Sequence, residues 1–517
     1  MEQIRRFPIG IQSFEVIRTN NYVYVDKTAL IYQLVSTYSP YFLSRPRRFG
    51  KSLLIATIKA YFEGRKELFE GLAIERLETK WEKYPVLHLD LNAKKYDSAE
   101  SLIAILNRYL EAWETIYGPK QGTTPEDRFI HVIEAAYRQT GKQVVVLVDE
   151  YDKPLLEHIL NEDISEEMRR VLKAFYGVLK SAADYLRFVF ITGVTKFAQV
   201  SVFSDLNQLS DISLEKRYAT LCGITEGELL QNFHIELEAL AQEEQLSFDE
   251  AVAKMRQRYD GYHFAHGAEG MFNPFSVLSA LTYLNLRNYW FQTGTPTFLA
   301  HLLENSDYDL RLIVDGVQMP ESSFAEYRAD QSSPIPLIYQ SGYLTIRGYD
   351  KRFHLYTLGF PNDEVRYGFM KFLAPYYTKV RGEETPFHIA NFSSELEAGE
   401  LDKFLQRMKI FFAGIPYELS DDTERHYQAI FYVVFTLMGE FVQAEVHGAN
   451  GRADAIVKTD KYIYVFEFKL NGTAEAALQQ IDSKDYSLPY QLDGRKVIKV
   501  GVSFDKEKRN INRYLIR

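Results

Sequence analysis

A ten-residue segment, Ser44–Leu53, constrains the fold of this chain more than any other part of the sequence. It reads Ser-Arg-Pro-Arg-Arg-Phe-Gly-Lys-Ser-Leu, follows the apolar run Pro40–Leu43 and precedes a helix-like run that reaches Phe62. A strand, a tight loop and a helix in this order form a phosphate-binding site, because loop N–H groups and the positive end of the helix attract anions. We therefore expect Lys51 to reach the terminal phosphates of a nucleotide and Ser52 to bind Mg²⁺.

The loop departs from the usual pattern of Gly, four residues and Gly-Lys-Ser/Thr. Gly50, Lys51 and Ser52 fit the second half of that pattern, but Arg45 stands in the place of the first glycine and Arg47 follows it. Because guanidinium groups bond phosphate oxygens in pairs, we expect Arg45 and Arg47 to add charge to the site. A bare Gly-Lys-Ser also arises by chance, so the assignment depends on the strands that follow.

The second part of the predicted site is the apolar run Val144–Val148, which Asp149 and Glu150 follow directly. Five consecutive apolar residues predict a strand buried on both faces of a parallel sheet. Because ligands of open α/β sheets bind at the carboxyl ends of the strands, we expect Asp149 to hold Mg²⁺ and Glu150 to polarise the attacking water. Acidic residues also end strands as helix caps, but two of them about 95 residues after the loop favour a nucleotide site.

A third strand-like run begins at Leu186 and carries Thr192, Thr195 and Lys196 at its end. We expect a polar group there, Thr192 first, to contact the terminal phosphate. The alternative is ordinary capping of the strand end, which needs no ligand.

Composition bounds the remaining possibilities. The chain has 517 residues, enough for roughly three domains, and its 46% hydrophobic residues are ordinary for globular proteins. A net charge of −10 gives no global attraction to nucleic acid, so any such contact must come from a local basic face. The single cysteine, Cys222, excludes an internal disulfide and a cysteine-rich zinc site. With no signal-like N-terminus and no membrane-length apolar run, we expect a cytoplasmic protein without membrane contact.

The loop and the two strand ends resemble the AAA-ATPase-like family of P-loop ATPases. The resemblance extends to Tyr24–Thr28, Tyr259–His263 and Phe272–Phe275, and it covers most of residues 5–300. It implies that the chain binds and hydrolyses ATP with Mg²⁺, with Gly50 and Lys51 in the phosphate-binding loop. Arg45 in place of glycine looks usual within this branch.

The middle of the chain has helix-like periodicity at Glu226–Gln245 and Phe248–Tyr259, typical of a helical lid beside an ATPase core. Arg256 and Arg258 lie on it, either as solvated surface residues or as a trigger arginine for ATP hydrolysis. Residues 336–358 then predict a helix followed by a hairpin, the outline of a winged helix. Such modules bind DNA or pack domains, and the thin basic patch here favours packing.

The last third predicts a second catalytic centre. We expect a linker at residues 384–390, helices, and then a hairpin whose second strand, Tyr462–Lys469, is apolar except near its end. Strands alternate their faces, so Glu467 and Lys469 point the same way, and Asp454 on the preceding strand lies opposite them. Two carboxylates sharing a small site bind Mg²⁺, and a lysine beside them orients water or neutralises a phosphodiester.

This arrangement resembles the PD-(D/E)xK nuclease superfamily over residues 390–517. The resemblance implies that Asp454 and Glu467 bind the metal and that Lys469 completes the catalytic set, with either Glu445 or Glu424 as an additional acid. Gln480 occupies a helix position that some members use, and Ala453 replaces the proline before Asp454. Degenerate members do not cut, so the resemblance leaves activity open.

The predicted fold class is α/β. It comprises a P-loop NTPase parallel sheet in residues 1–225, a helical and winged-helix-like middle in residues 226–383, and a C-terminal α/β restriction-endonuclease-like domain in residues 390–517. The function predicted is an ATPase coupled to a metal-dependent nuclease that acts on nucleic acid, DNA first, in defence or DNA processing. The alternatives are a signalling ATPase switch whose C-terminal domain binds without cutting, and a transposon-associated factor. Oligomer formation is left open.

Overall fold

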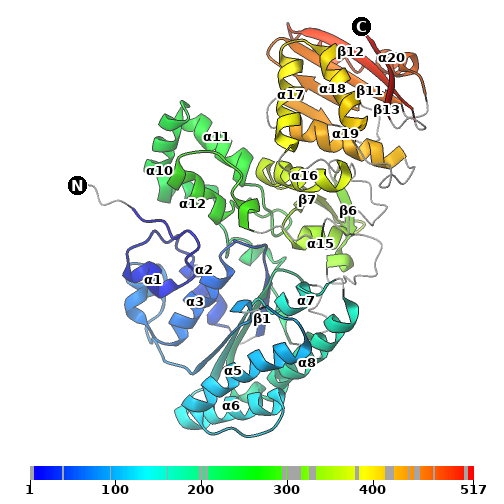
Figure 1. Cartoon of the computed structure of the whole chain (residues 1–517). Coiled ribbons are helices and arrows are strands. Elements are labelled where there is room, and N and C mark those ends of the chain that lie inside the picture. The colour runs from blue at the N-terminus through cyan, green and yellow to red at the C-terminus, as the bar shows by residue number, and fades with distance from the viewer. Residues whose placement is uncertain are drawn as a thin grey trace. The chain divides into compact units, whose positions relative to one another are not determined.

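The computed structural model divides the chain into two compact units (Figure 1). Unit 1 comprises residues 1–293 and 318–362, and unit 2 comprises residues 294–317 and 363–517. No helix in the described ranges combines the length and apolar character that crossing a membrane would require. The residues that the structure describes are 5–37, 40–93, 95–159, 161–196, 202–203, 206, 208–293, 299, 316–324, 334–378, 384–413, 424–439, 443–446, 454–469, 472–505 and 510–517.

The centre of unit 1 is a parallel sheet with the strand order β2-β3-β4-β1-β5 among its described residues. β3 is buried along its whole length, as the unbroken apolar run predicted. β1 precedes the phosphate-binding loop and β3 precedes Glu150, and β4 lies between these two strands. Because the three strands are parallel, their carboxyl ends, which carry the predicted site, lie at one edge of the sheet. The strands are β1 (Pro40–Ser44), β2 (Val86–Asp90), β3 (Val144–Asp149), β4 (Leu186–Gly193) and β5 (Ser210–Asp211).

Helices cover both faces of this sheet (Figure 1). α5, α6 and α8 pack against one another and share an apolar core with alternate residues of the strands, whereas α3 lies against β3 and β2 and shares none of that core. Local signals fix the helix ends: Ser98 caps α5, and Thr124 caps α6 with Pro125 in its first turn. The helices are α1 (Phe14–Thr19), α2 (Thr28–Val35), α3 (Lys51–Phe62), α4 (Ile74–Leu77), α5 (Ala99–Tyr117), α6 (Pro125–Thr140), α7 (Lys153–Leu156) and α8 (Glu162–Ser181).

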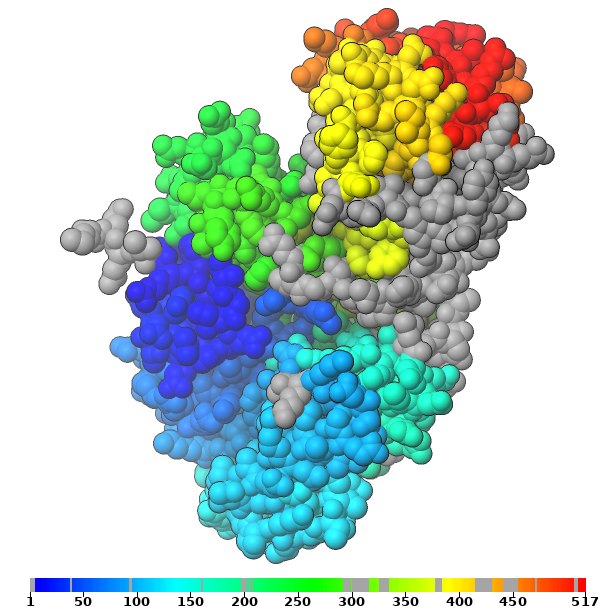
Figure 2. All heavy atoms as spheres, in the orientation of Figure 1, coloured from blue at the N-terminus to red at the C-terminus, as the bar shows by residue number. Residues whose placement is uncertain are grey.

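A helical region follows the sheet in sequence and packs on the N-terminal segment. It comprises α10 (Glu226–Glu243), α11 (Phe248–Tyr259) and α12 (Pro274–Tyr283). Arg5 pairs with Glu236 at 2.9 Å and Lys27 with Glu228 at 2.6 Å, so the first residues of the chain lie against α10. The space-filling view shows these blue and green segments in contact on the visible face (Figure 2).

A small module completes unit 1. We call residues 334–362 the α15–β8 module; it comprises α15 (Ile335–Gln340), β7 (Thr345–Asp350) and β8 (Leu355–Gly359). β7 and β8 form an antiparallel hairpin, and β6 (Val317–Pro320) lies beside β8. The helix-then-hairpin outline predicted from the sequence is therefore confirmed.

Unit 2 is built on a five-stranded mixed sheet with the order β13-β12-β11-β10-β9 among the described residues. β11 and β12 are parallel, and the other neighbours are antiparallel. The strands are β9 (Gln443–Val446), β10 (Ala455–Lys458), β11 (Tyr462–Lys469), β12 (Lys496–Asp505) and β13 (Asn510–Ile516), and the helices are α16 (Asp363–Thr378), α17 (Thr385–Glu397), α18 (Leu401–Ala413), α19 (Glu424–Met438) and α20 (Ala474–Ser483).

The two faces of β11 meet different helices. Phe466 contacts Phe404 of α18 and Phe435 of α19, whereas Ile463 and Val465 share a core with α20. Because side chains alternate along a strand, the residues that follow Val465 with period two, Glu467 and Lys469, belong to the α20 face.

Two expectations about organisation differ from the structure. The linker predicted at residues 384–390 is wrong, because α17 begins at Thr385 and carries Pro386 in its first turn, where proline fits a helix. The three consecutive domains predicted from the sequence also do not follow the two units: residues 226–293 and 318–362 lie with the first sheet, whereas residues 363–383 belong to unit 2. The side chains of the middle region pack into the phosphate-binding loop, which explains that grouping.

Gly501 of β12 permits α20 to approach the sheet closely. A Cβ at this position would lie 2.4 Å from the carbonyl oxygen of Ala474 and 2.9 Å from the Leu478 backbone nitrogen. We expect Gly501→Ala to lower the free energy of unfolding of unit 2 by about 2–3 kcal/mol, because overpacking forces the helix outward. Gly494→Ala, where a Cβ meets nothing within 4 Å, should cost only about 1 kcal/mol for its positive φ.

Hydrogen–deuterium exchange of peptides from β11 in a urea series measures this difference. Tryptophan fluorescence would not, because Trp81, Trp113 and Trp290 all lie in unit 1. Equal urea midpoints for Gly501→Ala and Gly494→Ala would contradict the close-approach argument.

Candidate active sites

The phosphate-binding loop of unit 1 connects β1 to α3. Gly50 caps α3 in the left-handed conformation, with φ +90°, which glycine adopts at low cost. The Lys51 ammonium is buried and donates to the carbonyl oxygens of Arg45 at 2.9 Å and Pro46 at 3.1 Å. It has three donors, so the loop's own carbonyls hold it in place and leave one for a phosphate oxygen. Ser52 follows in the first turn of α3 and is partly buried.

The two arginines predicted to bind phosphate lie in different environments. Arg45 is buried, and its guanidinium donates to the carbonyl oxygens of Ser213 at 2.8 Å and Tyr218 at 3.1 Å. These contacts hold it inside unit 1 and favour a structural role, while phosphate contact by Arg45 stays a prediction. Arg47 is exposed and lies near Glu150, so it remains available to an anion.

Asp149 and Thr192 meet at the carboxyl ends of β3 and β4. The Thr192 hydroxyl donates to Oδ1 of Asp149 at 2.6 Å, and both side chains are buried. The hydrogen bond fixes the carboxylate and leaves its second oxygen for a cation. In this structure Thr192 therefore orients Asp149, and contact between Thr192 and a phosphate stays a prediction.

Glu150 has an unusual backbone and an unusual environment. Its φ is +52°, which a non-glycine residue rarely adopts and which often marks a functional site. Burial raises the pKa of Glu150, while the nearby charges of Lys51 and Arg47 oppose that rise. A partly buried carboxylate beside Lys51 is suited to accept a proton from water.

Sequence analysis did not assign a role to Asp152, which organises the end of β4. Its buried carboxylate accepts the backbone N–H of Val194 and both the N–H and the hydroxyl of Thr195, the latter two at 2.6 Å. Thr195 is thus engaged in structure, and Lys196 pairs with Asp211 at 2.7 Å. The signal in the sequence was an acidic residue soon after Asp149 and Glu150. The sequence does not show, however, which strand the Asp152 carboxylate would contact.

The second candidate site lies at the end of β11 in unit 2. The antiparallel pairing of β10 with β11 places Asp454 beside Glu467 and Phe468, and Oδ2 of Asp454 accepts the Phe468 N–H at 2.8 Å. Lys469 Nζ donates to Oε1 of Glu467 at 3.2 Å and to Oε1 of Gln480 at 2.5 Å. The predicted geometry of the hairpin, with Glu467 and Lys469 on one face, is confirmed.

Glu467 is the most informative residue of this site. Its side chain is 2% exposed, and Oε2 is buried with no hydrogen-bond partner among the described residues. Burial, together with the nearby charge of Asp454, raises the pKa of Glu467 to about 7. An unpartnered carboxylate oxygen facing a second carboxylate fits a divalent cation, which would satisfy the oxygen and neutralise both charges.

The donor set contains two carboxylates among the described residues, and no cluster of three or more acidic, histidine or cysteine side chains is found there. The side chains of Glu445 and Glu424, the alternative additional acids, lie outside what the structure describes. Arg256 and Arg258 are held within unit 1, by Glu226 and at 3.5 Å by Asn288.

Comparisons with known proteins match the two parts of the chain that carry these candidate sites. Residues 8–203 match the family model "Predicted AAA-ATPase", and residues 422–514 match the model "PD-(D/E)XK nuclease superfamily". A protein of Azotobacter chroococcum mcd 1, named "Uncharacterized protein in vnfD 5'region", is 34% identical over 533 residues, which cover 99% of each chain. The chain belongs to the AAA-ATPase-like family. Its C-terminal part belongs to the PD-(D/E)XK nuclease superfamily, so both resemblances predicted from the sequence are confirmed.

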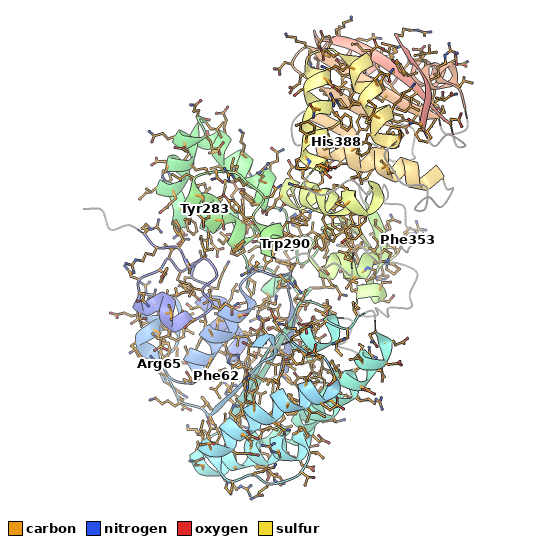
Figure 3. The ribbon with its side chains drawn as sticks, viewed as in Figure 1. Phe62, Arg65, Tyr283, Trp290, Phe353 and His388 are labelled. Atoms are coloured by element: carbon orange, nitrogen blue, oxygen red, sulfur yellow. The ribbon has the colours of Figure 1, made fainter. Side chains whose placement is uncertain are left out.

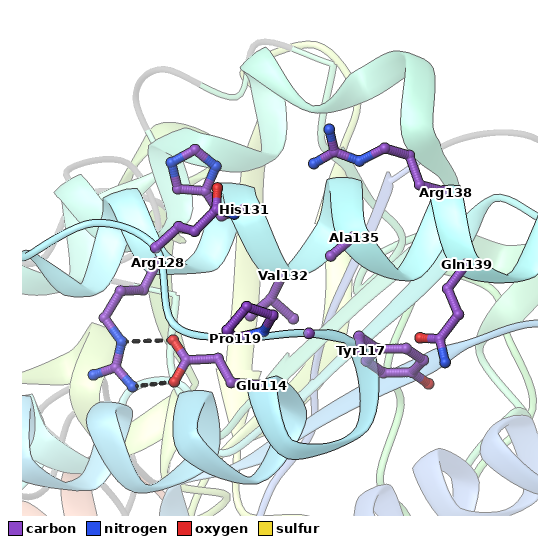
Figure 4. Close-up of a pocket in the computed structure, with 11 residues that line it drawn as sticks. Glu114, Tyr117, Pro119, Arg128, His131, Val132, Ala135, Arg138 and Gln139 are labelled. Carbon is purple, nitrogen blue, oxygen red and sulfur yellow. Dashed lines mark hydrogen bonds and ion pairs between the residues drawn. The ribbon is translucent and has the colours of Figure 1, made fainter.

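The AAA-ATPase-like part also contains a pocket of about 370 Å³ between α5 and α6 (Figure 4). Arg128 closes one side by donating to both carboxylate oxygens of Glu114, at 2.8 and 2.7 Å. None of the residues predicted for nucleotide or metal binding lines it. The lining residues are Glu114, Tyr117, Gly118, Pro119, Gln121, Arg128, His131, Val132, Ala135, Arg138 and Gln139.

The buried charge of Glu467 should make the metal-free protein less stable at high pH. Because the folded pKa is about 7, above the ordinary value of about 4.3, the folded state binds the proton more tightly. The free energy of unfolding of unit 2 should therefore fall by about 3 kcal/mol in total as pH rises from 4 to 8. Glu467→Gln removes the charge and should be more stable than wild type at pH 8, but not at pH 4.

Urea titrations in EDTA, followed by hydrogen exchange of β11 peptides, measure both proteins at each pH. Asp482→Asn is the matched control, because Asp482 on α20 is paired with Lys499 and Arg517 and its pKa is lowered. A Glu467→Gln variant that loses stability at pH 8 would contradict the expectation.

Proposed function

We propose that this protein is an ATPase that controls a metal-dependent nuclease carried on the same chain. The observation that carries the nuclease assignment is the buried Oε2 of Glu467, which has no hydrogen-bond partner in the described part of the chain. Asp454 lies beside this glutamate, and Lys469 Nζ lies 3.2 Å from its Oε1. Such a cluster costs stability in the absence of a cation, which is typical of a site kept for chemistry.

At the first site, ATP would bind across the loop of residues 45–52. Lys51 would orient the terminal phosphates, and Ser52 and Asp149 would hold Mg²⁺. Bound Mg²⁺ would neutralise charge that develops on the transferred phosphoryl group. Glu150 would accept a proton from the attacking water, aided by its position beside Lys51.

At the second site, Asp454 and Glu467 would hold Mg²⁺ or Mn²⁺. The bound ion would lower the pKa of a water molecule and polarise the phosphodiester. Lys469, held by Glu467 and Gln480, would orient that water and stabilise negative charge on the phosphate. The proposed substrate is nucleic acid, and DNA in particular. The proposed setting is defence against foreign DNA or DNA processing.

Cleavage assays with the purified full chain test this proposal. Linear, circular and single-stranded DNA, and RNA, would be incubated with Mg²⁺ or Mn²⁺, with and without ATP. We expect metal-dependent cleavage that changes when ATP is added, and ATP hydrolysis stimulated by the cleaved substrate. Hydrolysis of ATP without cleavage of any substrate would overturn the nuclease assignment and favour the signalling switch.

A further inference from the structure

The arginine-rich part of the phosphate-binding loop is covered by residues that follow it by more than 200 positions. The Arg45 guanidinium lies 4.2 Å from the ring centre of Phe264, and the Phe49 ring lies 4.7 Å from that of Tyr262. The Arg48 guanidinium lies 4.9 Å from the ring centre of Phe275. Residues 259–263 and 272–275 are two of the segments that resemble the AAA-ATPase-like family, and no catalytic role has been assigned to them. Tyr262 and Phe275 show that both segments contain a residue that packs on this loop.

Pro46 and Arg47, the other two residues of this part of the loop, also contact residues far along the chain. Trp290, labelled in Figure 3, donates its Nε1–H to the carbonyl oxygen of Arg47 at 3.2 Å. Gly342 of the α15–β8 module lies so close to Pro46 that a Cβ on it would be 2.5 Å from the proline Cβ. Each residue from Arg45 to Phe49 thus touches a residue of the segment 262–342.

The α15–β8 module also holds the end of β4. Gln340 is buried, accepts the Lys196 N–H at 2.8 Å and donates to the Phe324 carbonyl oxygen at 2.9 Å. Lys196 lies four residues after Thr192, which orients Asp149. The module therefore contacts both sides of the predicted phosphate position: the loop after β1 and the segment after β4.

We propose that Trp290 and Gly342 are positioning residues of the nucleotide site, and that they couple nucleotide occupancy to the docking of the α15–β8 module. This inference rests on the proposed ATP site and names its regulation. Lys51 already lies across the loop with a donor to spare, so the docked loop suits a phosphate. A nucleotide that binds the docked loop must stabilise the docking by the same factor by which the docking strengthens nucleotide binding.

The proposed coupling would extend from the loop to the residues at which the larger segment of unit 2 begins. The module ends at Asn362, whose Nδ2 donates to the carbonyl oxygen of Asp260 at 2.7 Å, and the larger segment of unit 2 begins at the next residue, Asp363. Gly261 beside that contact leaves no room for a Cβ, which would lie 2.2 Å from the Pro361 carbonyl oxygen. Nucleotide binding at the loop would thus order the segment from which the nuclease-bearing part of the chain continues.

The test compares Gly342→Ala and Trp290→Phe with Gly348→Ala in the full-length protein. Gly348 lies in the same module, but its added Cβ would meet Thr357 only at 3.7 Å, an ordinary contact. Nucleotide affinity is measured by titration with ADP and a non-hydrolysable ATP analogue. Docking is measured by hydrogen–deuterium exchange of residues 334–349, so neither readout requires catalysis.

We expect nucleotide to slow exchange of residues 334–349 in wild type and in Gly348→Ala. Gly342→Ala should bind nucleotide about tenfold more weakly and lose the protection, and Trp290→Phe, which removes one hydrogen bond, about fivefold. Trp290→Phe keeps the ring and so remains informative if Gly342→Ala fails to fold. Wild-type affinity in both variants, or nucleotide binding without protection, would overturn the coupling alone. No nucleotide binding by wild type would overturn the ATPase proposal as well.

Discussion

Lys469→Ala should abolish metal-dependent cleavage by the AAA-ATPase-like protein, with a loss on the order of 10²–10⁴-fold in rate. Lys469 is the cation that approaches both Glu467 and Gln480, so its removal leaves no described side chain to replace it at that position. The side chain is 29% exposed, so we expect only a small change in the stability of unit 2. ATP hydrolysis, which depends on unit 1, should persist.

Lys461→Ala is the matched control for this loss. Lys461 stands one residue before β11, at the opposite end of the strand from Glu467, and it is exposed. The control should cleave like wild type. If Lys469→Ala cleaves at the rate of Lys461→Ala, Lys469 is not part of the catalytic centre and the cleavage arises elsewhere.

Lys51→Ala should reduce kcat/KM for ATP hydrolysis about 10²–10³-fold, because it removes the buried ammonium that is expected to contact the terminal phosphates. The substitution also leaves the carbonyl oxygens of Arg45 and Pro46 without their donor, so part of the loss would arise from a loosened loop. Any effect of ATP on nucleic-acid cleavage should disappear in the same variant.

Glu150→Gln tests hydrolysis without loosening the loop. It keeps Lys51 and its loop contacts, so nucleotide should bind while hydrolysis fails. Lys59→Ala is the control for Lys51→Ala, because both lysines lie on α3. Lys59 is partly exposed and pairs only weakly, at 3.7 Å, with Glu63. Normal hydrolysis by Lys51→Ala would contradict the assignment of the loop as the ATP site.

Local patterns predicted the strands and the faces on which their side chains lie. The apolar run before Asp149 predicted a fully buried parallel strand, and period-two alternation placed Glu467 and Lys469 on one face. These features depend on neighbours in sequence, so one chain suffices to find them. The residues predicted to form a linker, 384–390, instead include the first turn of α17, where Pro386 is well suited to the helix.

Long-range contacts could not be predicted in the same way. The sequence did not predict the contacts of Arg45 with the carbonyl oxygens of Ser213 and Tyr218, because these partners lie about 170 residues away and carry no side-chain signal. The contact of Gln340 with Lys196 is hidden for the same reason, since a single polar residue in an apolar helix has no preferred partner in sequence. The middle region was therefore assigned its own domain instead of a place on the ATPase core.

The contacts of Arg45 also bear on how this loop can evolve. Arg45→Gly would give the loop the commoner glycine at the start of the phosphate-binding pattern, yet it would remove the guanidinium that donates to the carbonyl oxygens of Ser213 and Tyr218 and packs on the Phe264 ring. The Tyr218 oxygen would keep the Leu221 N–H, whereas the Ser213 oxygen would lose its buried donor. A buried oxygen left without a donor costs about 1–3 kcal/mol, so the substitution should destabilise unit 1. Phe264 and residues 213–218 thus make this arginine part of the fold of unit 1 as well as part of the loop.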